Sequence, residues 1–217
     1  MAGLRVLVAA ACWAPLLALG GAPSNAEIEQ LCAQAEDAAH CGRLIEEAQL
    51  KRLPELARRQ GNVLVVSLYP SGSTTFTDSD DPVNGRSYSL WDYLDGINAV
   101  LVYTTIGDNA SFMLLQRTNN LRFELPTEPK LSPDRQRLVT ADICATRCMH
   151  EIAVWRISRD GLRKELTWSP SKTWIDASAN WKDAETLAID YTLADSMAGA
   201  TLERKLNDPT WKRVAAP

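Results

Sequence analysis

The amino-acid sequence predicts a mainly β protein, an antiparallel meander of blade-like sheets preceded by a short helical hairpin. Two observations predict this class. Residues 27–60 are rich in Ala, Glu, Gln, Leu and Arg, which favour helices. After residue 61, short runs of β-branched and aromatic residues recur, and Gly, Asn, Asp or Pro separates nearly all of them. We therefore expect three parts, which are residues 1–26, a helical segment over residues 27–60 and a repeated β domain over residues 61–217.

Composition and charge exclude several classes of protein. Hydrophobic residues make up 46% of the 217 residues and charged residues 23%, which is ordinary for a globular domain and excludes disorder over most of the chain. A formal net charge of −4 argues against a protein that binds nucleic acid or an anionic membrane surface. The sequence contains no phosphate-binding glycine loop or dinucleotide fingerprint, so we expect no cofactor.

Residues 1–26 have the pattern of a secretory signal peptide. Arg5 precedes an apolar run over residues 6–19, and small residues follow as far as Ala26. We place cleavage after Ala26, with cleavage after Ala22 as the alternative. The apolar run is short for the roughly 20 residues that span a bilayer, so we expect an exported protein, periplasmic or secreted, without a transmembrane segment after cleavage.

Cysteine usage fits an oxidising compartment. Cys12 lies inside the leader, where an alternative interpretation makes it the lipid-carrying residue of a lipoprotein. The other four cysteines are an even number, which favours two disulfides in an exported chain. Their order favours Cys32–Cys41 and Cys144–Cys148, and the other two pairings stay open.

A zinc site is the alternative use of these cysteines. His40 precedes Cys41, and His150 lies two residues after Cys148. The spacings C-x8-C and C-x3-C match no common zinc finger, so we expect disulfides and no metal.

A Cys32–Cys41 bridge constrains the helical segment. In an unbroken helix these two residues lie about 13 Å apart along the axis, which is too far to bridge. The bridge therefore requires a turn at residues 37–40 and makes residues 27–60 a pair of short helices. Pro54 ends or kinks the second helix.

The second helix has an apolar side and a charged side. Leu44, Ile45 and Ala48 fall near one face, which we expect to be buried. Glu46 and Lys51 belong to the charged side, which we expect to face solvent.

Residues 61–217 contain an internal repeat. An acidic turn at Asp95, Asp134 or Asp183 is followed each time by a strand with a buried pattern, a loop and a hairpin. The copies are 39 and 49 residues apart, close to the roughly 40–50 of propeller blades. The segment is long enough for three to four blades, so the sequence predicts an open or small β-propeller-like array, with a sandwich as the alternative.

One copy of the repeat carries a recognisable motif. Residues 131–138, Leu-Ser-Pro-Asp-Arg-Gln-Arg-Leu, resemble the turn of WD-type repeats and of the envelope-translocation β-propellers. Residues 153–157, Ala-Val-Trp-Arg-Ile, resemble the strand that follows it. Arg135 stands where the motif usually has Gly, and Arg156 replaces its second signature residue. The whole chain is also similar to uncharacterised exported bacterial proteins. The resemblance implies blade-like β architecture and assigns no function, because functions on such folds are diverse.

Catalytic constellations are scarce. Asp78, Asp80 and Asp81 form an acidic cluster, but Pro82 occupies the next alternate ligand position of a calcium loop, so we expect a solvated turn. Residues 71–73, Ser-Gly-Ser, do not form a nucleophile elbow. We expect no catalytic residue.

Tryptophan provides the remaining signal. Trp168, Trp174 and Trp181 belong to a loop-like stretch with few aliphatic residues, which makes them candidates for an aromatic binding surface. Trp91 and Trp155 fit core positions better.

These observations predict an exported, non-catalytic binding module that recognises a protein partner in the cell envelope. A small envelope hydrolase with a carboxylate or metal site is one alternative. A structural component of envelope assembly is the other.

Overall fold

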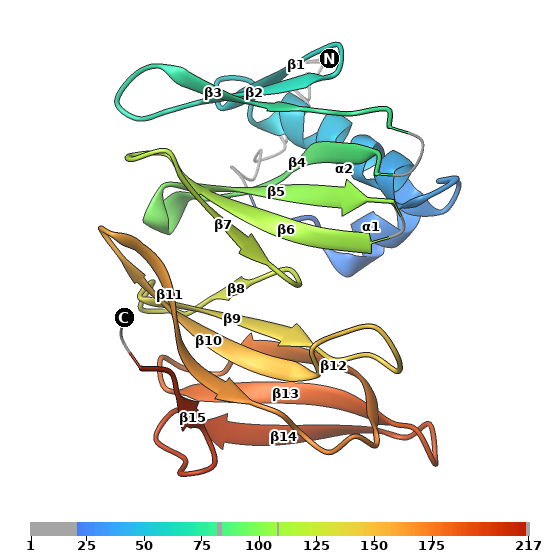
Figure 1. Cartoon of the computed structure of the whole chain (residues 1–217), viewed down its shortest axis with the longest axis vertical. Helices are drawn as coiled ribbons and strands as arrows, with labels where there is room; N and C mark the ends of the chain where they lie inside the picture. Colours follow the sequence, from blue (N-terminus) through green and yellow to red (C-terminus); the bar gives the residue numbers. More distant parts are fainter. Residues whose placement is uncertain (1–20, 82–83, 108, 216–217) are drawn as a thin grey trace, which may run out of the picture.

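The protein is mainly β, with a helical hairpin at the start of the described chain. The computed structural model describes residues 21–81, 84–107 and 109–215, so most of the predicted signal peptide lies outside the described residues. Two α-helices precede four antiparallel sheets, which follow one another along the long axis of the molecule (Figure 1). The predicted fold class is thus confirmed.

The helical hairpin consists of α1 (Asn25–Cys32) and α2 (Ala38–Arg52). Ser24 caps α1 and Asp37 caps α2, and each side chain accepts a hydrogen bond from a backbone amide of the first turn. The chain turns between the two helices at residues 33–37, slightly earlier than the predicted 37–40, because Ala38 already begins α2; this helix ends just before Pro54.

The helical segment is shorter than residues 27–60. Residues Ala57–Gln60 form β1, which pairs with β2 (Val63–Ser67). Gly61 takes a positive φ of 58° in the tight turn between them, a conformation that glycine adopts without strain. Pairing with β2 therefore outweighs the helix propensity of the Ala-Arg-Arg-Gln run.

We number the sheets 1 to 4 in chain order. Sheet 1 is β1-β2-β3, sheet 2 is β4-β5-β6-β7, sheet 3 is β15-β11-β10-β9-β8, and sheet 4 is β12-β13-β14. The remaining strands are β3 (Ser73–Thr77), β4 (Arg86–Leu94), β5 (Ala99–Ile106), β6 (Asn109–Gln116), β7 (Leu121–Leu125), β8 (Lys130–Leu131), β9 (Arg137–Asp142), β10 (Glu151–Ser158), β11 (Gly161–Trp168), β12 (Trp174–Trp181), β13 (Thr186–Leu193), β14 (Gly199–Lys205) and β15 (Lys212–Arg213).

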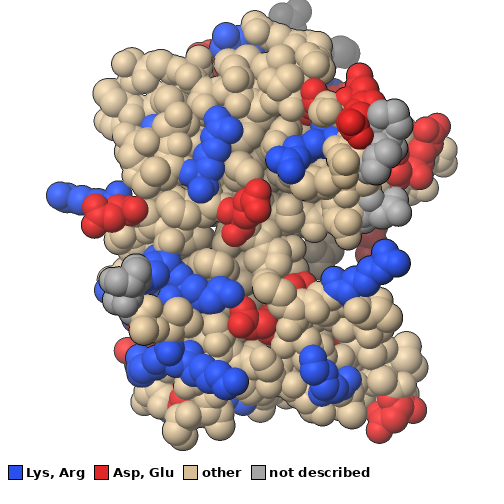
Figure 2. Space-filling view, in the orientation of Figure 1, with Lys and Arg blue, Asp and Glu red and all other residues tan. Residues whose placement is uncertain are grey.

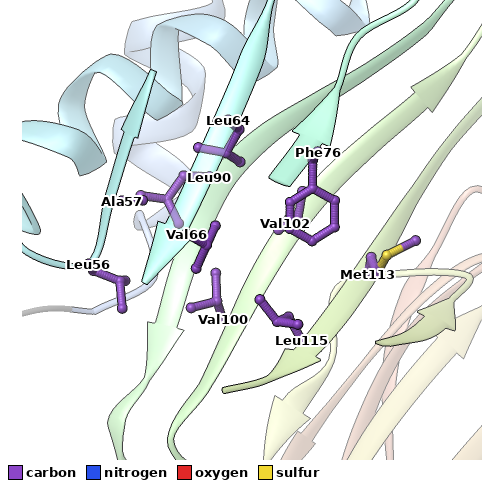
Figure 3. Close-up of a cluster of buried hydrophobic side chains, with 10 residues drawn as sticks. All are labelled: Leu56, Ala57, Leu64, Val66, Phe76, Leu90, Val100, Val102, Met113 and Leu115. Atoms are coloured by element: carbon purple, nitrogen blue, oxygen red, sulfur yellow. The ribbon is translucent and has the colours of Figure 1, made fainter. Parts of the chain in front are cut away.

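Three hydrophobic layers separate the four sheets. Strand β5 lies between two of them, because successive side chains of a strand point to opposite faces. Val100 and Val102 pack in the layer between sheets 1 and 2, which Figure 3 shows. Ala99 and Leu101 pack in the layer between sheets 2 and 3. The central sheets are thus buried on both faces.

The two end sheets carry polar side chains on their outer faces. Ser73, Thr75 and Thr77 are exposed along β3, and Asp190 and Thr201 are exposed on the paired strands β13 and β14. A polar outer face ends a stack of repeated sheets, because it offers no apolar surface to a further sheet. In the described part of the chain, sheets 1 and 4 are not hydrogen-bonded to each other.

The acidic turns precede equivalent strands, but the last hairpin departs from the predicted repeat. Asp95, Asp134 and Asp183 lie just before β5, β9 and β13, each the second strand of its sheet. Arg135 has a φ of 60°, the conformation for which Gly is usual at this point of the motif. In the third copy, β15 pairs with β11 of sheet 3 rather than joining sheet 4.

Both disulfides expected from the cysteine order are present. The Cα atoms are 4.9 Å apart in Cys32–Cys41 and 5.8 Å apart in Cys144–Cys148. Within the described residues, no helix is long and apolar enough to cross a membrane.

Candidate functional site

The predicted tryptophan surface is divided between two places. Trp168 and Trp174 touch edge to face, with ring centroids 5.5 Å apart, and Trp174 stacks on Tyr191 at 3.7 Å. Trp174 is only 7% exposed. Trp181 lies at the other end of β12, roughly 20 Å away at the usual rise of a strand.

These rings serve mainly as core between sheets 3 and 4. The stretch expected to be a loop contains strand β12, and a register irregularity between Trp174 and Asp176 turns the Trp174 ring inward. Trp181 packs against the same layer, and its Nε1 donates a hydrogen bond of 2.8 Å to the Lys130 carbonyl oxygen in sheet 3. Trp91, at 5% exposure, is a core residue as expected.

Glu46 is not solvated as the helix pattern predicted. It is 2% exposed and receives Arg59 Nε at 2.8 Å on Oε1 and Arg59 Nη2 at 2.6 Å on Oε2. Arg43 Nη1 and the Leu90 amide also donate to its carboxylate. Burial raises the pKa of Glu46, while the Leu90 amide and Arg43 lower it. Lys51 is exposed as expected, so the prediction of a solvated charged side is wrong for Glu46, which lies where α2 meets sheets 1 and 2.

One residue of the acidic cluster that was expected to form a solvated turn, Asp78, instead belongs to the same network. The carboxylate of Asp78 is paired with Arg43 and Arg59, and it accepts the Tyr88 amide at 2.9 Å. Burial raises the pKa of Asp78, and the Tyr88 amide and Arg43 oppose this. Within the described residues, no group of three or more His, Cys, Asp or Glu is placed to hold a metal ion.

A cleft of about 700 Å³ lies where sheets 2, 3 and 4 meet the start of α1. A recess between the upper and lower halves of the molecule is visible in Figure 2. Its walls are mostly polar and come from five separate segments. The charged side chains are Glu128, Lys130, Asp142, Arg147 and Asp176.

The charges of the cleft differ in how far they are already satisfied. Lys130 pairs with Glu128 at 2.9 Å, and the Asp142 carboxylate accepts the Met149 amide at 2.8 Å. The guanidinium of Arg147 and the carboxylate of Asp176 have no hydrogen-bonding or ion-pair partner among the described residues. These two groups are therefore available to a ligand.

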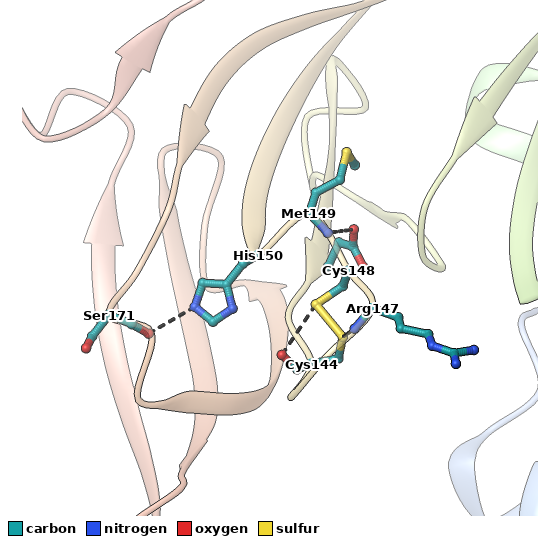
Figure 4. Close-up of a disulfide and its surroundings, with 7 residues drawn as sticks. Cys144, Arg147, Cys148, Met149, His150 and Ser171 are labelled. Carbon is teal, nitrogen blue, oxygen red and sulfur yellow. Dashed lines mark hydrogen bonds between the residues drawn. A yellow bond between two sulfur atoms is a disulfide. The ribbon is translucent and has the colours of Figure 1, made fainter.

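A disulfide loop forms one wall of the cleft (Figure 4). The loop joins β9 to β10, and Cys144 forms an isolated antiparallel bridge with Asp176 of β12. In the figure, the Arg147 side chain extends away from the disulfide. His150 is 5% exposed, and its Nε2 lies 2.9 Å from the Ser171 carbonyl oxygen, so it has a structural partner.

Asp92 is a buried acid whose charge interacts with two residues of the cleft wall. It is 4% exposed, and its Oδ1 has no hydrogen-bond partner. Burial raises the pKa of Asp92 to about 6; the Tyr93 amide lowers it, Glu128 raises it further and Lys130 lowers it.

No protein-family model, no curated protein and no solved structure matches this chain. Its function has to be argued from the cleft itself. Sequence reasoning did not single out the cleft, because its walls come from residues as distant as Asn25 and Asn180 and share no local pattern.

Proposed function

We propose that this protein is an exported, non-catalytic binding module that recognises a protein partner in the cell envelope through the cleft between its sheets. One observation carries the proposal. The cleft has, among the residues that line it, an unpaired guanidinium and an unpaired carboxylate, on Arg147 and Asp176, beside small and amide side chains. A polypeptide surface supplies groups of both charges, and complementary charges give such contacts their specificity.

The two disulfides support export, because such bonds persist in oxidising compartments. The two predicted cleavage sites differ in what they leave behind. Cleavage after Ala22 keeps Ser24, the cap of α1, whereas cleavage after Ala26 removes it. The N-terminal sequence of protein purified from the periplasm or medium identifies the site. Recovery of uncleaved chain from the cytoplasm alone would refute export.

Charge reversal in the cleft tests the binding proposal. We expect the Arg147→Glu variant to lose a partner that the wild-type protein retains from envelope extract of its host. Arg163→Glu is the matched control, since Arg163 is exposed on β11 and its side chain has no hydrogen-bonding or ion-pair partner among the described residues. Equal retention by both variants would show that the cleft is not the binding surface.

An envelope hydrolase is the second candidate, because the carboxylates of Glu128, Asp142 and Asp176 line the same cleft. Paired carboxylates are the usual groups of glycoside hydrolysis. Clearing of a cell-wall suspension by the wild-type protein, abolished by Asp176→Asn but not by Arg163→Glu, would establish this activity in place of the binding role.

A further inference from the structure

The Cys144–Cys148 disulfide lies in the wall of the cleft, where a ligand would pass it. Both cysteines line the cleft, and the three residues between them are exposed. None of these residues belongs to a regular strand. A reagent that enters the cleft therefore meets this sulfur pair without any prior opening of the fold.

The other disulfide has a different setting. Cys32 and Cys41 join α1 to α2, and both pack against the hydrophobic layer between sheets 2 and 3. Neither of them lines the cleft. All four cysteines are half-buried, so the two bonds differ in their setting rather than in exposure. Only Cys144–Cys148 lies where a thiol can be held beside it in the cleft, so this bond should exchange faster within one molecule.

The two sulfurs in the cleft have opposite electrostatic surroundings. The Arg147 amide points at Cys144 Sγ, with a nitrogen–sulfur distance of 3.2 Å. Cys148 Sγ instead lies 3.4 Å from the Cys144 carbonyl oxygen. An amide N–H stabilises a thiolate, whereas a carbonyl oxygen opposes negative charge. Cys144 is consequently the better leaving group of the pair.

We propose that Cys144–Cys148 is a thiol–disulfide exchange site whose substrate is a thiol bound in the cleft. The substrate thiolate attacks Cys148 Sγ, a new disulfide forms between them, and the Cys144–Cys148 bond breaks. Cys144 leaves as a thiolate beside the Arg147 amide and takes a proton from water. A second substrate thiolate then attacks the substrate sulfur of the mixed disulfide, the bond from this sulfur to Cys148 Sγ breaks, and Cys148 leaves as a thiolate that takes a proton from water. Two substrate thiols are thereby oxidised to one disulfide, and Cys144 and Cys148 are reduced to thiols.

The fold tolerates the opening of this bond. The bond closes a loop of only five residues, and so short a closure constrains the unfolded chain little. Neither cysteine belongs to a hydrophobic layer, and strands β9 and β10 pair directly with each other.

Reduced glutathione is the probe for the first test. The native, mature protein is incubated with it, quenched with an alkylating reagent and analysed by peptide mass spectrometry. We expect the Cys144–Cys148 pair to be alkylated at least tenfold faster than the Cys32–Cys41 pair. We also expect the transient glutathione adduct on Cys148. Equal rates for the two pairs, or an adduct confined to Cys144, would overturn the proposal.

A substitution at position 147 tests the role of the backbone amide. Arg147→Pro removes the N–H that points at Cys144 Sγ, whereas Arg147→Ala keeps this N–H and removes only the guanidinium. We expect Arg147→Pro to slow reduction several-fold compared with Arg147→Ala, with unchanged tryptophan fluorescence as the check on folding. If Arg147→Pro alters the fluorescence, the proposal is decided by the wild-type protein alone, from the cysteine that carries the glutathione adduct and from the ratio of the alkylation rates of the two cysteine pairs. Equal rates of reduction for the two folded variants would show that the Arg147 amide does not make Cys144 the better leaving group.

Discussion

The two halves of the stack hold neighbouring sheets together by different physical means. In the upper half, sheets 1 and 2 and helix α2 share the buried ionic network of Glu46, Asp78, Arg43 and Arg59. In the lower half, sheets 3 and 4 share a layer that contains Trp174. A buried ion pair fixes geometry but must offset a desolvation cost, whereas aromatic burial stabilises directly. The stability of the upper interface should therefore depend on every charge of the network being paired. The stability of the lower interface should depend on the side-chain volume that fills its layer.

Trp174→Ala should have the largest effect. The ring is 7% exposed and stacked on Tyr191, and its removal leaves a cavity between sheets 3 and 4. We expect a loss of about 3–5 kcal/mol in the free energy of unfolding, measured by urea titration. Trp181→Ala is the comparison, because this ring is only partly buried, and it should cost less. Equal losses would mean that the lower layer does not centre on Trp174.

Glu46→Ala should be the most damaging change in the upper half. It removes one of the two carboxylates with which Arg43 and Arg59 pair, and leaves two guanidinium groups beside Asp78 in a largely buried site. We expect a loss of about 3 kcal/mol, since an uncompensated buried charge is costly. Glu203→Ala removes the exposed pair with Lys182 and should leave the midpoint of unfolding unchanged. A Glu46→Ala loss no larger than that control would show that the network contributes little.

These two sites also show what sequence could and could not predict. The Cys32–Cys41 turn was predictable because it follows from the rise of a single helix. The burial of Glu46 was not predictable, because its place on the helix is typical of a solvated residue and only the packing of sheet 1 encloses it. Trp174 was assigned to a loop, since the irregularity that turns it inward leaves no mark in the composition. The cleft was missed for the same reason as Glu46, because distant segments build it.

Asp92 extends the comparison to pH. Its pKa is raised from 3.8 to about 6 in the folded protein, so the folded state binds more protons than the unfolded state between these values. The contribution of Asp92 to the free energy of unfolding is therefore fully present below about pH 4, and it is lost as the pH rises through about 6. Asp92→Asn should be more stable than the wild type by about 2 kcal/mol at pH 7.5, a pH chosen about one to two units above that pKa.

The measurement for Asp92 is urea unfolding at pH 4 and pH 7.5. The advantage of the Asn variant should disappear at the lower pH, because the wild-type carboxyl is then protonated in the folded state. Asp95→Asn is the control, since Asp95 is exposed on the adjoining turn. A constant difference at both pH values would contradict the assignment of the effect to Asp92 ionisation.

Arg204→Lys should have the smallest effect, and it tests whether the lower half uses charge at all. The Arg204 guanidinium carbon lies 3.5 Å from the centre of the Trp168 ring, and the side chain also contacts Asp208. A planar guanidinium stacks on an indole, whereas an ammonium does not, so we expect a loss of about 1 kcal/mol. A double-mutant cycle with Trp168→Phe should return a coupling of about 0.5–1 kcal/mol that changes little with added salt. A coupling that vanishes at high salt would assign the contact to Asp208, and charge pairing would then hold both halves of the stack.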